Sequence, residues 1–222
     1  MKLLLTSNGI CNSSIKKALS ELIDKPFSET TIAFIPTAAN ADPTNKEYVV
    51  DDLVNIKNLK LKMLDIVDIS ALPRRLWLPR LEKSDVLFFS GGMTPHLMYW
   101  INKSGLAELL PKMLETRVYA GISAGSMVSG PSIVLSNQDK KIYYEKWTGY
   151  GSDKGLHLVD FYVRPHLNSR FFPLANPSFF ADLAKSLKDP IYVLDDQSAL
   201  KVVNNKIEII SEGDFLVFNE RK

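Results

Sequence analysis

The sequence has little of the two side chains from which disulfides and zinc sites are built. Its 222 residues contain one cysteine, Cys11, and three histidines. A single cysteine cannot form an intramolecular disulfide, and so few sulfur and nitrogen ligands argue against a zinc site of the usual composition. The phosphate-binding patterns G-x-x-x-x-G-K-[ST] and G-x-G-x-x-G are also missing, which argues against a nucleotide. We therefore expect a reducing compartment, no metal and no cofactor.

A charge excess and a long apolar run are absent as well. The 27 Lys and Arg residues nearly balance the 25 Asp and Glu residues, and a formal net charge of +2 gives no reason to expect nucleic acid. The longest strictly apolar run, residues 97–101, is far shorter than the roughly 18 residues of a membrane span. The apolar N-terminus stops at Thr6, before the apolar segment of a signal peptide could form. We expect a cytoplasmic protein that binds neither membrane nor nucleic acid.

Short apolar runs alternate with helical patterns over the first 125 residues. Runs closed by turn residues predict buried strands, and apolar residues at helical spacing between them predict helices. Strands that alternate with helices in this way form a parallel sheet covered on both faces. The predicted strands are residues 3–6, 31–35, 61–66, 86–89 and 118–120, and the predicted helices are residues 15–22, 45–56, a helix opened by Pro95, and 106–115.

The C-terminal part has a different pattern. Apolar runs at 192–194, 200–203, 207–210 and 215–218 are separated by tight polar turns such as Asn204-Asn205, which indicates hairpins and an antiparallel edge. No internal repeat, low-complexity tract or linker interrupts the chain. Its length suits one full-sized domain, so we expect residues 1–222 to form a single α/β domain.

One pentapeptide has the form of a nucleophile elbow. Gly121-Ile122-Ser123-Ala124-Gly125 matches G-x-S-x-G and directly follows a predicted strand. A serine on such a sharp turn projects at the carboxyl edge of the sheet, and the helix that starts there points free amides at a developing oxyanion. The competing interpretation is a Gly- and Ser-rich turn that merely closes a strand.

A second glycine loop follows another predicted strand. Ser90-Gly91-Gly92-Met93-Thr94 should therefore lie at the same sheet edge as Ser123. Consecutive glycines let backbone amides approach a substrate closely, which would supply a second oxyanion donor. The competing interpretation is a strand-to-helix turn in which glycine is required only for steric reasons.

A serine nucleophile needs a base, and the three histidines are the candidates. His166 is preferred because it stands at a predicted strand end before a polar loop. His157 is second. Its competing interpretation is the polar face of a strand, and that of His96 is a surface histidine in the first turn of a helix. The acid that would orient the base is left open among the strand-end pair Asp195-Asp196 and the alternatives Asp139 and Asp160.

Taken together, these segments resemble the S51 serine peptidase family over essentially the whole chain. The resemblance implies the flavodoxin-like fold of class I glutamine amidotransferases, a mostly parallel sheet with helices on both faces. It assigns the nucleophile to Ser123, the base to His166 and the acid to Asp196, with the amides of Gly92 and Ala124 forming the oxyanion hole. The matching segments are residues 3–9, 34–38, 89–94, 121–126, 164–166 and 193–200.

The chain departs from the peptidase E members of that family in three places. Their additional aspartate after the elbow falls on Gln138, with Asp139 adjacent as a reserve acid. Their third glycine and asparagine correspond to Gly92 and Met93 here, and the stretch that holds their arginine for an acidic side chain is shortened. The expected substrate-binding residues are Gly91, Met93, Arg164 and Arg170.

The resemblance implies a serine exopeptidase that hydrolyses small peptides, as a dipeptidase or aminopeptidase with or without a preference for Asp-X. A homodimer is an open possibility. One alternative is an α/β-hydrolase esterase that uses Ser123, Asp160 and His166. The other is a small-molecule binding protein that keeps the scaffold without turnover.

Overall fold

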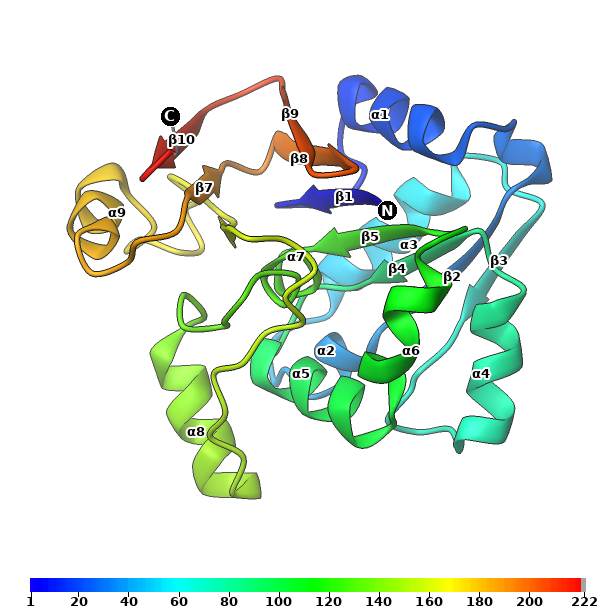
Figure 1. Cartoon of the computed structure of the whole chain (residues 1–222), viewed down its shortest axis with the longest axis horizontal. Coiled ribbons are helices and arrows are strands. Elements are labelled where there is room, and N and C mark those ends of the chain that lie inside the picture. Colours follow the sequence, from blue (N-terminus) through cyan, green and yellow to red (C-terminus); the bar gives the residue numbers. More distant parts are fainter. Residues whose placement is uncertain (221–222) are drawn as a thin grey trace.

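A seven-stranded, mostly parallel sheet forms the centre of the computed structural model, which describes residues 1–220 (Figure 1). The strand order is β3-β2-β4-β5-β1-β8-β9. Strands β3, β2, β4, β5 and β1 run parallel, whereas β8 is antiparallel to β1 and β9 is antiparallel to β8. The strands are β1 (Lys2–Thr6), β2 (Thr31–Ile35), β3 (Met63–Ile66), β4 (Val86–Phe89), β5 (Val118–Ile122), β8 (Ser198–Val203) and β9 (Lys206–Ser211).

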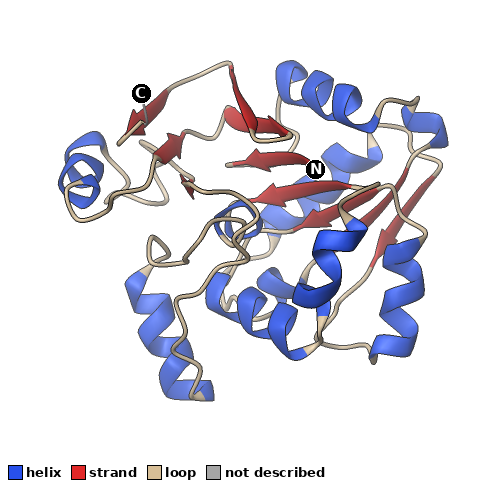
Figure 2. Ribbon diagram, in the orientation of Figure 1, coloured by secondary structure: helices blue, strands red, loops and turns tan. Residues whose placement is uncertain are grey.

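Helices cover both faces of this sheet (Figure 2). They are α1 (Ser13–Ile23), η1 (Phe27–Glu29), α2 (Thr37–Asn40), α3 (Glu47–Lys57), α4 (Arg74–Glu82), α5 (Thr94–Lys103), α6 (Leu106–Met113), α7 (Ala124–Met127), α8 (Gln138–Thr148) and α9 (Pro177–Ala184). Within residues 1–220, no helix is long and apolar enough to cross a membrane.

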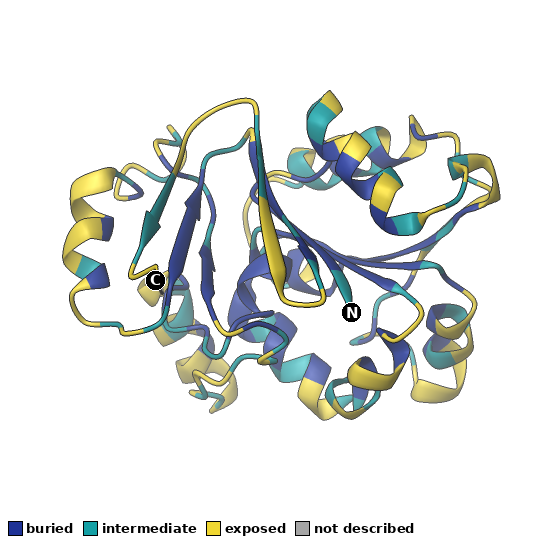
Figure 3. Cartoon of the chain, turned by 45° about the horizontal axis from the view of Figure 1, so that its top comes forward, coloured by how far each residue is buried: buried dark blue, intermediate teal, exposed yellow. Residues whose placement is uncertain are grey.

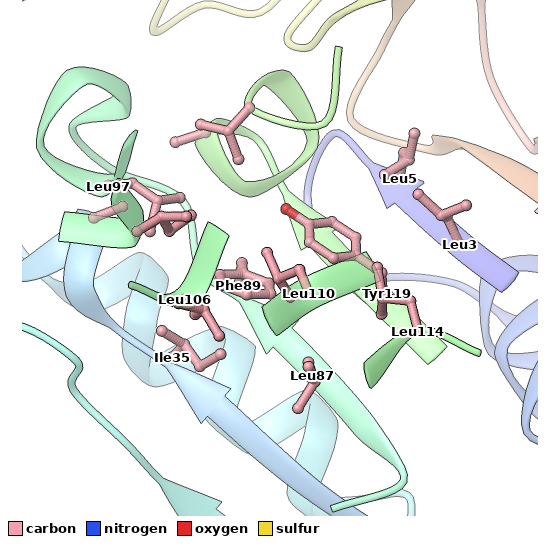
Figure 4. Packing of buried hydrophobic residues seen from close by; sticks show 14 of the residues in the cluster. Leu3, Leu5, Ile35, Leu87, Phe89, Leu97, Leu106, Leu110, Leu114 and Tyr119 are labelled. Carbon is pink, nitrogen blue, oxygen red and sulfur yellow. The ribbon is translucent and has the colours of Figure 1, made fainter. Parts of the chain in front are cut away.

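The two-residue period of the strands divides the core into two clusters. In β1, Leu4 packs with α1 and α3, whereas Leu3 and Leu5 pack on the opposite face with residues of α4, α5 and α6. Figure 4 shows the face that carries Leu3 and Leu5, where the rings of Phe89 and Tyr119 stack with centroids 4.8 Å apart. Figure 3 shows the central strands of the sheet buried and the outer faces of the helices exposed, whereas the edge strand β9 is partly exposed. Buried on both faces, the strands are apolar at consecutive positions, which is why their sequence reads as continuous runs.

The C-terminal strands differ from the prediction in one respect. The antiparallel edge is confirmed, because β8 and β9 extend the main sheet. However, β7 (Ile191–Leu194) and β10 (Phe215–Phe218) leave that edge and form a separate three-stranded sheet with β6 (Tyr162–Arg164). In it β10 is antiparallel to β7, but β6 is parallel to β7. Hairpin signals identify neighbours in sequence and cannot show that the strand before Asp195 belongs to another sheet.

Three of the longer helices, α4, α8 and α9, were not predicted from the sequence, as the single-turn α2 was not, and the compositions of the longer ones explain why. Helix α4 contains Pro79 and only two buried side chains, Trp77 and Leu81. Helix α8 buries only Tyr144, and α9 is short and follows a loop. Without a regular apolar stripe, a helix has no periodic signal in its sequence. The predicted strand at 61–66 begins two residues late, at Met63, and the one at 118–120 continues to Ile122.

Helix α3 buries a carboxyl group on its inner face. The Asp52 side chain is 5% exposed, and its Oδ1 lies 2.7 Å from the position that a Cβ on Gly9 would take. Burial, and then the charge of neighbouring Asp51, raise the pKa of Asp52 to about 7. Because the unfolded chain ionises this carboxyl at lower pH, Asp52 destabilises the fold progressively as pH rises from about 4 to about 7.

We therefore expect Asp52→Asn to stabilise the protein at pH 8 by roughly 1–4 kcal/mol and to change little at pH 4. Urea unfolding of both proteins at the two pH values measures this difference. The matched control is Asp51→Asn on the exposed side of the same helix. An equal effect of Asp52→Asn at both pH values would contradict the assignment.

Candidate active site

The Ser123 turn has the strained backbone of a nucleophile elbow. Ser123 lies between β5 and α7 with φ 48° and ψ −103°, a conformation that costs free energy in any residue with a side chain. Its N–H donates to the carbonyl of Thr6 at the end of β1, 3.0 Å away. The serine is therefore held at the carboxyl edge of two neighbouring parallel strands, where ligands bind in open α/β folds.

The glycines of this turn are required by close packing. A Cβ on Gly125 would lie 2.3 Å from the carbonyl oxygen of Phe89, and a Cβ on Gly121 would lie 2.5 Å from the Gly125 carbonyl carbon. The Tyr119 hydroxyl donates to the Gly125 carbonyl at 2.6 Å, and the Ser126 hydroxyl donates to the carbonyls of Thr6 and Gly121 at 2.8 and 2.9 Å. The turn is thus compressed between β1, β4 and β5 and fixed by buried hydrogen bonds.

Three side chains from three strand ends form a continuous hydrogen-bonded chain. The Ser123 Oγ lies 2.9 Å from His166 Nε2, and His166 Nδ1 lies 2.6 Å from Asp196 Oδ1. These distances suit a serine whose hydroxyl proton passes to an imidazole held by a carboxylate. The structure therefore brings together the three residues that the sequence singled out.

The small second sheet positions the base and the acid. His166 follows β6 and Asp196 follows β7, and because these strands are parallel their ends meet at one edge. The pairing continues past β6, since Leu167 N donates to the Leu194 carbonyl at 2.9 Å. His166 has a left-handed backbone with φ 69°, and its ring stacks on Phe172 with centroids 4.4 Å apart.

Asp196 is held in its ionised form. Burial alone would raise its pKa, but hydrogen bonds from His166, Ser7 and Ser169 and the charge of His166 outweigh burial and lower the pKa below its ordinary value. The adjacent Asp195 serves the turn instead: its Oδ1 accepts from Gln197 N and from the Ser198 hydroxyl. Asp196 therefore accepts a hydrogen bond from His166, whereas Asp195 accepts hydrogen bonds within the turn.

Sequence reasoning missed Ser7. Its hydroxyl donates to Asp196 Oδ1 at 2.8 Å and accepts from His166 N at 2.9 Å. Ser7 lies in the matching segment at residues 3–9, but no role was assigned to it from the sequence. No local signal distinguishes it, because its two partners lie far away in the sequence.

The second glycine loop lies beside Ser123. A Cβ on Gly91 would lie 3.4 Å from Ser123 Cβ, so the loop and the elbow are in contact. Gly92 has φ 132°, and a Cβ there would lie 2.4 Å from the Ala38 carbonyl oxygen, so only glycine fits. Ala124 is the first residue of α7, where an N–H has no partner within the helix. The loop and the helix start therefore place backbone amides around Ser123.

The other candidate bases and acids lie elsewhere. His157 pairs with Asp160 at 2.8 Å on the surface, where their side chains are 62% and 74% exposed. Asp160 is therefore not the partner of His166, and the geometry gives no support to the esterase arrangement. His96 Nδ1 lies 3.1 Å from the Tyr144 hydroxyl, and burial lowers the pKa of its imidazole. Asp139 is exposed in the first turn of α8.

The expected substrate-binding residues have contrasting environments. Met93 is buried, and its N–H donates to the Ala38 carbonyl at 2.9 Å. Arg170 is exposed, with its guanidinium 4.7 Å from the Phe171 ring centroid. Arg164 is partly buried, donates to the Pro165 carbonyl and lies over the Phe180 ring. Burial lowers the pKa of Arg164 to about 10. Within residues 1–220 this guanidinium forms no ion pair, and no group of three or more potential metal ligands is present.

Known proteins are similar to this chain in both sequence and fold. The model of peptidase family S51 matches residues 3–210. An uncharacterized peptidase of Listeria innocua is 30% identical over 189 residues, which cover 80% of this chain and 87% of that protein. Peptidase E of Haemophilus influenzae is 25% identical over 206 residues, covering 86% and 79%.

Solved structures agree at the level of the fold. A Listeria monocytogenes protein provisionally named peptidase E has a TM-score of 0.78 to this chain at 22% identity, covering 96% of this chain and 98% of that one. The mostly parallel sheet with helices on both faces is thus an arrangement found in peptidase E structures. Since the family model spans nearly the whole sequence, the chain belongs to peptidase family S51 and is a serine-type peptidase.

Proposed function

We propose that this peptidase is an exopeptidase that cleaves small peptides through an acyl-enzyme on Ser123, with His166 as base and Asp196 as its orienting acid. The observation that carries the proposal is the hydrogen-bonded chain of Ser123 Oγ, His166 Nε2, His166 Nδ1 and Asp196 Oδ1, with distances of 2.9 and 2.6 Å. The family match supports the serine-type chemistry.

In the acylation step, His166 Nε2 takes the Ser123 hydroxyl proton as Oγ attacks the scissile carbonyl carbon. The same proton then passes to the leaving amine, so that the C–N bond breaks and an ester to Ser123 remains. The Asp196 carboxylate accepts from His166 Nδ1, which keeps Nε2 free to accept and stabilises the imidazolium that forms. Water, activated by His166, hydrolyses the ester and releases the second product.

The negative charge of the tetrahedral intermediate needs donors that are already in place. The amides of Gly92 and Ala124 supply them, one from the loop after β4 and the other from the first residue of α7. Neither donor has to reorganise during the reaction, because the loop and the elbow are packed against each other. Loss of one such donor costs on the order of 10²–10³ in rate.

Arg164 supports a subsite for a substrate carboxylate. A partly buried, desolvated guanidinium without an ion-pair partner among the described residues is costly unless a ligand completes it. It lies two residues before His166. Arg170, the other candidate, is exposed and can be hydrated without a ligand. We therefore assign Arg164 to the recognition of an acidic side chain in substrates of the Asp-X type, within an otherwise broad preference for small peptides.

The catalytic roles are tested by two substitutions on one dipeptide substrate. We expect Ser123→Ala to lower kcat by about 10⁴-fold or more, because it removes the nucleophile. Asp196→Asn should cost on the order of 10⁴, because the amide favours the wrong imidazole tautomer.

The matched control for Asp196→Asn is Asp139→Asn, which should leave kcat nearly unchanged. If Asp139→Asn rather than Asp196→Asn abolishes turnover, the acid is assigned wrongly. Should a fluorophosphonate fail to label Ser123 in the native protein, the non-catalytic interpretation of the scaffold would be favoured instead.

Specificity is tested with dipeptides and aminoacyl anilides that carry Asp, Asn, Leu, Gly or Met at the first position. We expect Arg164→Leu to lower kcat/KM for the Asp substrates by about 30-fold or more, because the carboxylate loses a desolvated partner, and to spare the others. Arg170→Leu serves as control and should change Asp-X cleavage less than threefold. Equal losses of kcat/KM on Asp and Leu substrates would show that Arg164 supports the fold and does not recognise the substrate side chain.

A further inference from the structure

The Ser7 hydroxyl joins the acid and the base of the site from a third direction. It donates to Asp196 Oδ1, the oxygen that also accepts from His166 Nδ1, and it accepts from the His166 backbone N–H. We propose that Ser7 is a positioning residue of the catalytic machinery, which acts through Asp196 and His166 without touching the substrate. This proposal rests on the proposed function, since it assigns a role within the same triad.

The hydrogen bonds of Ser7 form a closed ring. Starting from Ser7 Oγ, the ring runs to Asp196 Oδ1 at 2.8 Å, on to His166 Nδ1 at 2.6 Å, and back from His166 N to Ser7 Oγ at 2.9 Å. Ser7 is completely buried, so no bulk water replaces its hydroxyl. Both the donor and an acceptor site of the hydroxyl are used, which is the arrangement of an orienting group rather than of a satisfied surface serine.

His166 needs this second point of attachment because its backbone is strained. A non-glycine residue at φ 69° costs free energy, and such a conformation persists only when its surroundings enforce it. The bond from His166 N to Ser7 fixes the backbone, while the bond from Nδ1 to Asp196 fixes the ring. With both in place, Nε2 is directed at Ser123.

Other residues of the segment after β1 form hydrogen bonds to the backbone of the turn that carries Asp196. The Cys11 thiol donates to the Asp196 carbonyl at 3.0 Å, and the Asn12 side chain donates to the Gln197 carbonyl at 2.9 Å. Ser7 N donates to the Ser198 carbonyl at 3.2 Å. Among these contacts from the segment after β1, only the Ser7 hydroxyl reaches the carboxylate itself, where it acts together with Ser169 on the charge that His166 experiences.

Ser7 also tunes that charge. A donor on Oδ1 stabilises the carboxylate and weakens its hold on a protonated imidazole. Without the Ser7 donor, Asp196 would bind the imidazolium more tightly. The acidic limb of the pH–rate profile would then move to higher pH, because the base becomes available only after deprotonation.

The test uses the full-length chain with Ser7→Ala, and Ser198→Ala as matched control. Ser198 is likewise completely buried and donates to an aspartate, Asp195 Oδ1 at 2.5 Å, but that aspartate does not contact His166. We expect Ser7→Ala to lower kcat by about 10- to 100-fold, as loss of the outer partners that orient metal-bound histidines does. KM should change less than threefold, and the acidic limb should move upward. Ser198→Ala should do neither.

Two further measurements separate positioning from simple destabilisation. In an Asp196→Asn background, Ser7→Ala should cause a smaller additional loss in the rate at which a fluorophosphonate labels Ser123 than it causes in the native protein, because the part of its effect that acts through the Asp196 carboxylate is already gone. Ser7→Thr, which restores the hydroxyl, should recover most of kcat. Equal losses in both backgrounds, or a kcat and pH profile unchanged by Ser7→Ala, would overturn the proposal.

The role of Ser7 can still be tested if the proposed function is wrong. If the native protein cleaves no peptide and Ser123 is not labelled, the peptidase mechanism is refuted by that observation alone. The Ser7 role is then decided by NMR of the His166 Nδ1 proton. Faster exchange of this proton in Ser7→Ala, but not in Ser198→Ala, supports the role, and unchanged exchange in both variants refutes it.

Discussion

The close approach of the Ser123 turn to the end of β4 is the constraint on which the site depends. The backbone of Gly125 lies against the Phe89 carbonyl with no space for a Cβ, and the Tyr119 hydroxyl and the Ser126 hydroxyl tie the turn down. Close-packed interiors do not deform smoothly, so this contact sets the position of Ser123 rigidly. Everything that the serine can react with must be arranged around a point that the sheet has already determined.

The small second sheet places the base and the acid beside the fixed serine. Because β6 and β7 are parallel, their ends deliver His166 and Asp196 side by side. Asp196 lies in the turn between β7 and β8, where the chain passes from the second sheet to the main one. The junction of the two sheets is therefore also the point where the acid meets Ser7, which directly follows β1, and His166, which follows β6. A change in the relation of the sheets would change the triad.

Much of the fold could be predicted from local patterns. The parallel strands and the elbow were predicted because buried strands are continuously apolar and because the elbow needs glycine at two positions. Helix α8 could not be predicted, since its single buried residue leaves no stripe, and neither could the departure of β7 and β10 from the main sheet. Residue type and placement favoured His166 over His157, but the resemblance was needed to choose Asp196 among several acids.

By itself the sequence determined the parallel strands and the strongly amphipathic helices, the turn at Ser123 and a short list of partners, because these depend on contacts between near neighbours. Only the tertiary structure decided which partners meet. Ser123 and His166 are 43 residues apart, His166 and Asp196 are 30 apart, and Ser7 is 189 residues from the carboxylate that it holds. Their separations of 2.6–2.9 Å follow from strand order and register across two sheets, which are global properties of the packing and leave no trace in any local stretch of sequence.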